Sequence, residues 1–396
     1  MATASETRRS RLGAAFRQSD QVMPLELFFD LVFVLAITQC TSLMSDDPTW
    51  RGIGHGLLIL ALLWWSWVGY AWLTSVLDPE EGGVRIVLFA AMAAFLIAAI
   101  CEPEAFDGLA LEFAVAYGAV RVAHIGLFVI ASRDDPGLRR STVGLGIGMA
   151  IGVGLLIAGS FLDAGPRAAV WGLALVLDMA NPYLFGSEGW HLVPGHFAER
   201  HGLIIIIALG ESIVAIGVGA GGEMSWGIAG AAAAGIAILA AMWWMYFDVV
   251  ALVSARRLAD TPEGRVRNEL ARDSYSYIHF LMVAGIILAA LGLKKTIGHV
   301  DDPLETVPAF ALLGGVALYL VGLVAFRLRH VRSVNWRRFA LAVVLVALLP
   351  AATELPALAV SAIVAALLWA VVTIETRAYG EGRANVRHGD AFPAAR

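Results

Sequence analysis

Apolar residues along this chain are grouped into long continuous stretches, with short polar breaks between them. The stretches are close to the ~20 residues that a helix needs to cross a bilayer, and they do not show the strict alternation of β-strands. The pattern therefore predicts an all-α integral membrane protein with about twelve transmembrane helices. We expect them over residues 25–44, 53–76, 84–101, 110–131, 142–161, 168–184, 202–220, 226–253, 275–293, 306–326, 338–352 and 355–375.

Composition supports the same class. The 396 residues are 59% hydrophobic and only 15% charged, with a mean hydropathy of +0.74. Soluble domains carry about 25% charged residues, so a soluble protein is excluded and the lipid bilayer is the expected surrounding. No apolar core of a signal peptide precedes residue 24, and residues 1–23 are expected to be a polar cytoplasmic segment.

Positive charge predicts the orientation. With the N-terminus inside, 23 of the 28 Lys and Arg residues fall in the inner segments and four in the outer loops. This asymmetry is what the positive-inside rule requires for an even number of spans with both termini in the cytoplasm. Residues 377–396 are polar and are expected to form a disordered cytoplasmic tail.

Two segments of the chain look like copies of each other. "LLWWSWVGYAW" (62–72) aligns with "AMWWMYFDVVA" (241–251), and "FFDLVFVLAI" (28–37) aligns with "LGESIVAIGV" (209–218), which pairs Asp30 with Glu211. We therefore expect two parallel six-helix repeats, over residues 24–190 and 191–376, related by an axis along the membrane normal.

Ionisable residues within the predicted spans are the candidate functional residues, because charges at membrane depth are costly and commonly mark pathways. In "PLELFFDLVFVLAIT" (24–38) two carboxylates lie four residues apart and so share a helix face. The full set is Glu26, Asp30, Arg121, His124, Asp178, Glu211, Asp248 and His279. Arg121 is the permanent cation of this set, and the carboxylates outnumber it. One interpretation is a polar pathway for protons, a cation or a polar solute. The alternative is a static bridge between Arg121 and a carboxylate that fixes helix register.

Other chemistry has less support in the sequence. "HLVPGHFAERHG" (191–202) offers His191, His196, Glu199 and His201 as metal-ligand candidates, but helix capping, loop contacts and local salt bridges of Glu199 and Arg200 are the expected roles. Cys40 and Cys101 are expected to be free thiols. No phosphate-binding glycine loop, nucleophile elbow or nucleic-acid motif occurs, so we expect no cofactor, no metal, no catalytic residues and no nucleic-acid partner.

The stretches "LELFFDLVFVLAIT" and "HFAERHGLIIIIALGESIVAIG" resemble the bacterial low temperature requirement A (LtrA) family. The resemblance extends from about residue 22 to 375. It implies a multi-pass protein of the bacterial inner (plasma) membrane, and it leaves the biochemical activity open.

A looser resemblance concerns the first helix. Phe28-Phe29-Asp30 is similar to the Phe-Ser-Asp motif of the endolysosomal potassium channel family, which is also built from six-helix repeats. Phe29 replaces the serine, and Pro24 stands where that family has an arginine. The resemblance implies ion conduction involving Asp30, and Glu211 through the internal repeat.

We therefore expect an ion or proton-linked transport protein that uses intramembrane carboxylates. Two alternatives stay open: an intramembrane enzyme acting on a lipid-like substrate, with carboxylates as acid and base or with a metal held by His124, His196 or His279, and a membrane sensory or scaffold protein. The sequence leaves the transported ion or solute, and assembly into a homo-oligomer, undetermined.

Overall fold

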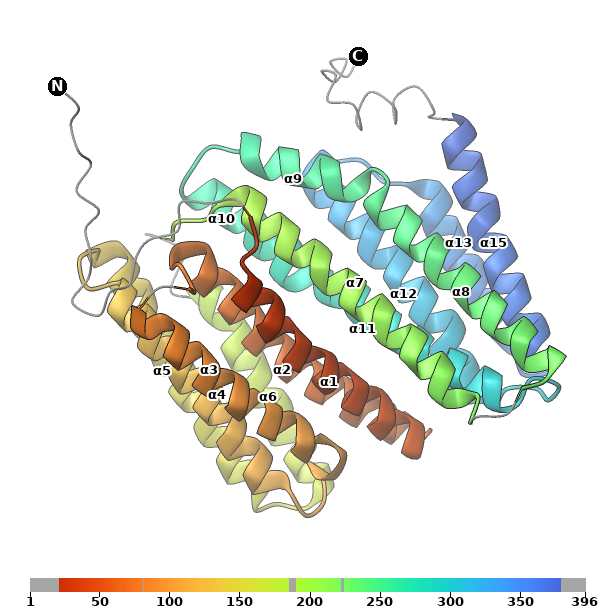
Figure 1. The fold of residues 1–396 in the computed structure, drawn as a ribbon, viewed down its shortest axis with the longest axis horizontal. Helices are drawn as coiled ribbons and strands as arrows, with labels where there is room; N and C mark the ends of the chain where they lie inside the picture. The colour runs from red at the N-terminus through yellow and green to blue at the C-terminus, as the bar shows by residue number, and fades with distance from the viewer. Residues whose placement is uncertain (1–20, 81, 185–189, 222–223, 379–396) are drawn as a thin grey trace. The chain divides into compact units, whose positions relative to one another are not determined.

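The computed structural model describes residues 21–80, 82–184, 190–221 and 224–378, and the regular elements in these ranges are helices (Figure 1). They are α1 (Pro24–Asp46), α2 (Trp50–Val76), α3 (Gly82–Cys101), η1 (Glu102–Glu104), α4 (Ala110–Ala131), α5 (Pro136–Ser160), α6 (Ala164–Leu184), α7 (Pro194–Gly219), α8 (Trp226–Phe247), α9 (Val250–Asp260), α10 (Arg265–Ala271), η2 (Arg272–Ile278), α11 (His279–Gly298), α12 (Thr306–Val331), α13 (Trp336–Ala347), α14 (Leu349–Ala352) and α15 (Ala357–Ala378).

Ten helices in the described ranges are long and apolar enough to cross a membrane. The all-α membrane class is thereby confirmed, whereas the twelve-span layout is not. The two expected spans without a qualifying helix correspond to α6 and α13. The buried face of α6 includes Arg167, Asp178 and Asn181, which lowers its hydropathy. α13 has only 12 residues and is interrupted before Pro350.

The helices group into two compact units. Unit 1 comprises Met1–Cys40, Leu58–Arg200 and Pro262–Glu269, and unit 2 comprises Thr41–Leu57, His201–Thr261 and Leu270–Arg396. Helices α1, α2 and α7 each contribute residues to both units. The expected repeats, 24–190 and 191–376, stay a prediction.

Unit 1 contains a run of successive helices packed on one another, α3 on α4, α4 on α5 and α5 on α6. Glycines permit the last of these contacts. A Cβ at Gly148 would collide with the Asn181 amide of α6, and one at Gly152 would touch the Ala174 carbonyl. Asn181 and Asp178 are thereby held against α5.

Unit 2 is organised by the packing of α11 on α12. Small residues let the two backbones approach, as is common between membrane helices. A Cβ added at Gly285 would lie 2.6 Å from the carbonyl oxygen of Gly315 and 2.6 Å from the Tyr319 nitrogen. The Tyr319 hydroxyl in turn donates to the Met242 carbonyl of α8 at 2.6 Å, which ties a third helix to the pair.

We predict that Gly285→Ala destabilises the protein by about 1–3 kcal/mol, the usual cost of forcing extra volume into a packed interior. Gly217→Ala is the matched control, because this α7 glycine has open space around its Cβ position and alanine is a better helix former. Thermal unfolding of both variants in one detergent measures the difference. Equal midpoints for the two variants would contradict the close contact of α11 with α12.

Candidate functional site

Two carboxylates are buried near the start of α1, in unit 1. Glu26 and Asp30 are 2% and 0% exposed, and their spacing of four residues places them on one face of the helix. One oxygen of Glu26, Oε2, accepts the Met23 backbone N–H at 2.9 Å. Glu26 therefore also satisfies an N–H group at the helix N-terminus, where a negative charge is favourable.

A matching pair of basic groups comes from α7. His196 and Arg200 are also four residues apart and buried. Arg200 donates from Nη1 to Glu26 Oε1 at 3.1 Å and from Nη2 to Asp30 Oδ1 at 3.0 Å. His196 Nε2 lies 2.8 Å from the same Glu26 oxygen. The two helices thus present complementary acid and base pairs at the same spacing.

Helix α2 completes this cluster. Trp67 donates its indole N–H to Asp30 Oδ1 at 2.8 Å, and Thr74 accepts a hydrogen bond from Arg200. Ser75 Oγ lies 3.0 Å from His196 Nδ1. The Arg200 guanidinium also lies over the Trp67 ring, 5.6 Å from its centroid, where a cation–π attraction adds to the ion pairs. We call Glu26, Asp30, Trp67, Thr74, Ser75, His196 and Arg200 the α1–α7 cluster.

Counted over its own seven side chains, the α1–α7 cluster has more acidic than permanently basic groups. Two carboxylates face one arginine, so one negative charge is left when His196 is neutral. A buried site with more carboxylates than arginines favours the binding of a proton. Binding one proton makes the cluster neutral. His196 is one place for it, and Asp30 Oδ2, a buried oxygen with no hydrogen-bond partner among the described residues, is the other.

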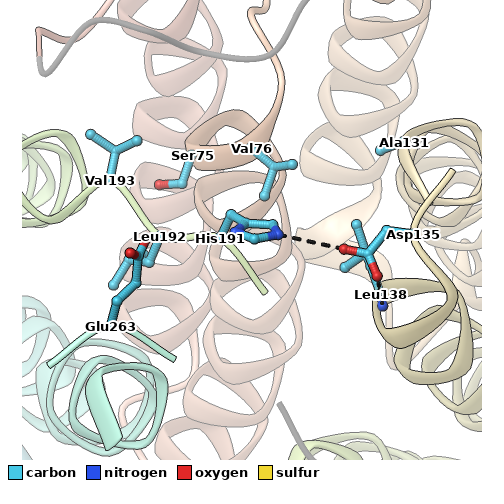
Figure 2. Close-up of a pocket in the computed structure, with 9 residues that line it drawn as sticks. All are labelled: Ser75, Val76, Ala131, Asp135, Leu138, His191, Leu192, Val193 and Glu263. Atoms are coloured by element: carbon cyan, nitrogen blue, oxygen red, sulfur yellow. Dashed lines mark hydrogen bonds and ion pairs between the residues drawn. The ribbon is translucent and has the colours of Figure 1, made fainter. Parts of the chain in front are cut away.

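A pocket of about 340 Å³ adjoins the cluster, at the end of unit 1 where α2 ends and α7 begins (Figure 2). Its wall includes Ser75, which is the member of the α1–α7 cluster among the residues that line it. The polar side chains around the pocket are Asp135, His191 and Glu263. Figure 2 shows the contact between Asp135 and His191, in which His191 Nε2 lies 3.4 Å from Asp135 Oδ2.

Asp135 caps the N-terminus of α5 at the edge of this pocket. Its carboxylate accepts the backbone N–H groups of Leu138 and Gly137 at 3.0 and 2.8 Å. These bonds to the charged form, the Leu138 bond first, and the nearby His191 hold the pKa of Asp135 below its ordinary value. The pocket therefore keeps an ionised carboxylate at its rim.

Arg121 pairs with Asp178 of α6 and not with the carboxylates of α1. It forms two hydrogen bonds from Nη2 to Asp178, at 3.0 and 2.7 Å, and both residues are buried. His124, one turn along α4, packs against the rings of Tyr70 and Phe128. A Cβ at Gly69 would lie 2.8 Å from the His124 ring, so this glycine leaves room for it.

The remaining candidates from the sequence lie in unit 2. Glu211, Asp248 and His279 are all buried. His279 Nε2 lies 3.0 Å from the Tyr246 hydroxyl, and its ring stacks on Tyr275 of the π-helix η2. The pairing of Asp30 with Glu211 through the repeat stays a prediction.

The metal-ligand candidates are not brought together within the units. In unit 1, His191 contacts Asp135, His196 contacts Glu26 and Ser75, and Glu199 accepts the Val22 backbone N–H at 3.3 Å. In unit 2, His201 packs against Tyr275 and His279. The described ranges contain no group of three or more His, Cys, Asp or Glu side chains arranged to hold a metal.

The largest correction concerns Arg200. The local salt bridge expected for it is wrong: Arg200 is 1% exposed and pairs with Glu26 and Asp30, which lie 174 and 170 positions away in the chain. The available signal was spacing, because His196 and Arg200 repeat the interval of Glu26 and Asp30. Glu102 was also missed. It lies buried beyond α3 and accepts the Cys40 thiol at 3.1 Å, while Cys40 and Cys101 are free thiols as expected.

These features define a polytopic helical membrane protein with an acid–base cluster buried in its helices. The family model described as "Bacterial low temperature requirement A protein (LtrA)" matches residues 21–373, so the chain belongs to this family. An uncharacterized protein of Rhizobium meliloti (strain 1021) is 33% identical over 309 residues, covering 75% of each chain. No solved structure matches the chain.

We predict that Arg200→Gln lowers the free energy of unfolding by about 3–5 kcal/mol, because it leaves two buried carboxylates without their arginine. Arg265→Gln is the control. It breaks the Arg265–Glu269 pair, in which the arginine side chain is 76% exposed, and such pairs contribute at most about 1 kcal/mol. Unfolding in a denaturing detergent titration compares the two variants. Adding Asp30→Asn to Arg200→Gln is expected to restore part of the loss, since it removes one uncompensated charge. Equal stability of the two single variants would contradict the buried ion pairs of Arg200 with Glu26 and Asp30.

Proposed function

We propose that this protein is a proton-linked membrane transport protein and that the α1–α7 cluster is its proton-binding site. The observation that supports the proposal is the charge balance of Glu26, Asp30 and Arg200, which favours binding of one proton at membrane depth. Proton-coupled carriers need a group of this kind, whose protonation changes the charge of a buried site.

The route to the cluster is a chain of hydrogen-bonding groups in unit 1. The pocket reaches Ser75, Ser75 contacts His196 Nδ1, and His196 Nε2 contacts Glu26. An imidazole bonded at both nitrogens can accept a proton at one and release one at the other. Arg200 joins Glu26 to Asp30, so a proton delivered through His196 changes the field at both carboxylates.

The membrane orientation expected from the sequence agrees with a route to the cluster from the cytoplasmic side. The positive-inside asymmetry supports a pocket that opens on the cytoplasmic side of the bacterial inner membrane. In this proposal Arg121 and Asp178 form a static pair that fixes α4 and α6. Glu211, Asp248 and His279 are the pathway candidates within unit 2, as the potassium channel resemblance implies for Glu211. The transported partner of the proton is a small ion or polar solute.

Flux through proteoliposomes tests the proposal. Purified protein is reconstituted with a pH-sensitive dye inside, and a pH gradient is imposed with potassium or sodium salts on either side. We expect proton flux above that of empty liposomes for the wild type and for Glu199→Gln, a carboxylate on the outer surface of α7. We expect Glu26→Gln and His196→Asn to reduce it to the level of empty liposomes, because each removes a link from the route.

Two outcomes would contradict proton-linked transport. One is wild-type flux equal to that of empty liposomes under every cation gradient. The other is flux that Glu26→Gln and His196→Asn leave unchanged while both variants remain folded. Circular dichroism and a single symmetrical peak in size-exclusion chromatography establish folding for each variant.

One arrangement favours a second candidate function, hydrolysis. Ser75, His196 and Glu26 follow the hydroxyl–imidazole–carboxylate order of serine hydrolases. Ser75 lies in the last turn of α2, however, where the neighbouring backbone N–H groups are used within the helix and do not form an oxyanion hole. We expect a fluorophosphonate probe to leave Ser75 unlabelled. Labelling that His196→Asn abolishes would favour the hydrolase over the transport protein.

A further inference from the structure

A second pocket, of about 380 Å³, lies at one end of unit 2. Three polar segments form its wall: Arg327 near the end of α12, the loop that leads into α13, and Glu375 near the end of α15. Val249 and Val250, at the junction of α8 and α9, form an apolar side. The transport site proposed above contains none of these residues.

Basic side chains predominate in the lining of this pocket. Its lining includes three arginines, Arg327, Arg337 and Arg338, and the carboxylate of Glu375. Arg338 is bound in a two-pronged ion pair, at 3.0 Å from Nε to Glu375 Oε1 and 2.8 Å from Nη2 to Oε2. This pair and the Arg338 bond to the Met245 carbonyl at 2.9 Å hold the Arg338 side chain in place.

The other two arginines are placed for an anion. Arg327 is half-buried, and its Nε donates to Ser333 Oγ at 3.0 Å. Arg337 is exposed at the start of α13. Guanidinium groups recognise phosphate oxygens through paired hydrogen bonds.

Position identifies the source of the phosphate. Helices α12 and α15, which qualify as membrane spans, both end at this pocket. Trp336 on its wall is 69% exposed, as is typical of tryptophans at the lipid headgroup level. A basic pocket with an apolar side at the end of membrane helices has the chemistry of an anionic lipid site.

We propose that this pocket binds the phosphate headgroup of an anionic phospholipid, with Arg327 and Arg337 on the phosphate and Val249 and Val250 beside the first carbons of the acyl chains. A soluble phosphate ester shares the headgroup chemistry but gains nothing from the apolar side. The two sources therefore differ in affinity, and an experiment can distinguish them.

Native mass spectrometry of the full chain in detergent, titrated with phosphatidylglycerol or phosphatidylcholine, tests this site. We expect the wild type to bind phosphatidylglycerol more tightly. Arg327→Gln with Arg337→Gln should weaken that binding by about 25-fold, roughly fivefold for each arginine near an anionic headgroup. The lysine pair, Arg327→Lys with Arg337→Lys, should keep most of the affinity because it keeps the charge.

The control is Arg139→Gln with Arg140→Gln, which removes two exposed arginines from the start of α5 and should leave the affinity unchanged. Equal binding of the two lipids, or an equal loss in this control, would overturn the site. So would sn-glycerol 3-phosphate binding as tightly as phosphatidylglycerol, since the ligand would then be a soluble phosphate ester. Size-exclusion chromatography of each variant establishes that losses are not due to unfolding.

Discussion

Unit 1 depends on one buried arginine. Arg200 is placed by α7 against two carboxylates from α1, and it also contacts Thr74 and the face of Trp67 from α2. Each of these groups is costly to bury alone, and they are tolerated because each satisfies another. The ion pairs therefore set the register of three helices at once, and they do so at the end of unit 1 that opens to the Ser75 pocket.

The same contacts support the proposal that the cluster binds a proton and is not a static bridge. Arg121 and Asp178 form a one-to-one pair with matched charge, and nothing in that pair requires a proton. The α1–α7 cluster has two carboxylates for one arginine, and a histidine that contacts both a carboxylate and a pocket-lining hydroxyl. The proposed site differs from the Arg121–Asp178 pair in its ratio of carboxylates to arginines, because both sets of residues are buried.

Hydrophobic pattern predicted the fold class because runs of apolar residues are a local property of the chain. It predicted the ten helices that qualify as membrane spans, but α6 and α13 do not qualify, because α6 carries buried polar groups and α13 is short. Glu26 and Asp30 were also accessible from the sequence, because charge within an apolar run is conspicuous. The partners of these carboxylates could not be predicted from the sequence, because Arg200 lies 170 residues from Asp30 in the chain. Arg200 also follows a polar segment that has the composition of an ordinary loop. Long-range pairing is a tertiary property, and spacing alone cannot specify it.

Exchange of the His196 side-chain protons with water tests the central claim most directly, because the account places this ring between the pocket and the buried carboxylates. Nitrogen-15 solid-state NMR of the imidazole in lipid, assigned with His196→Asn, measures this exchange. The account predicts rapid exchange in the wild type and slow exchange in Ser75→Ala, where the hydroxyl that joins the ring to the pocket is absent. Imidazole protons that do not exchange with water in the wild type, or that exchange at the same rate without the Ser75 hydroxyl, would contradict it.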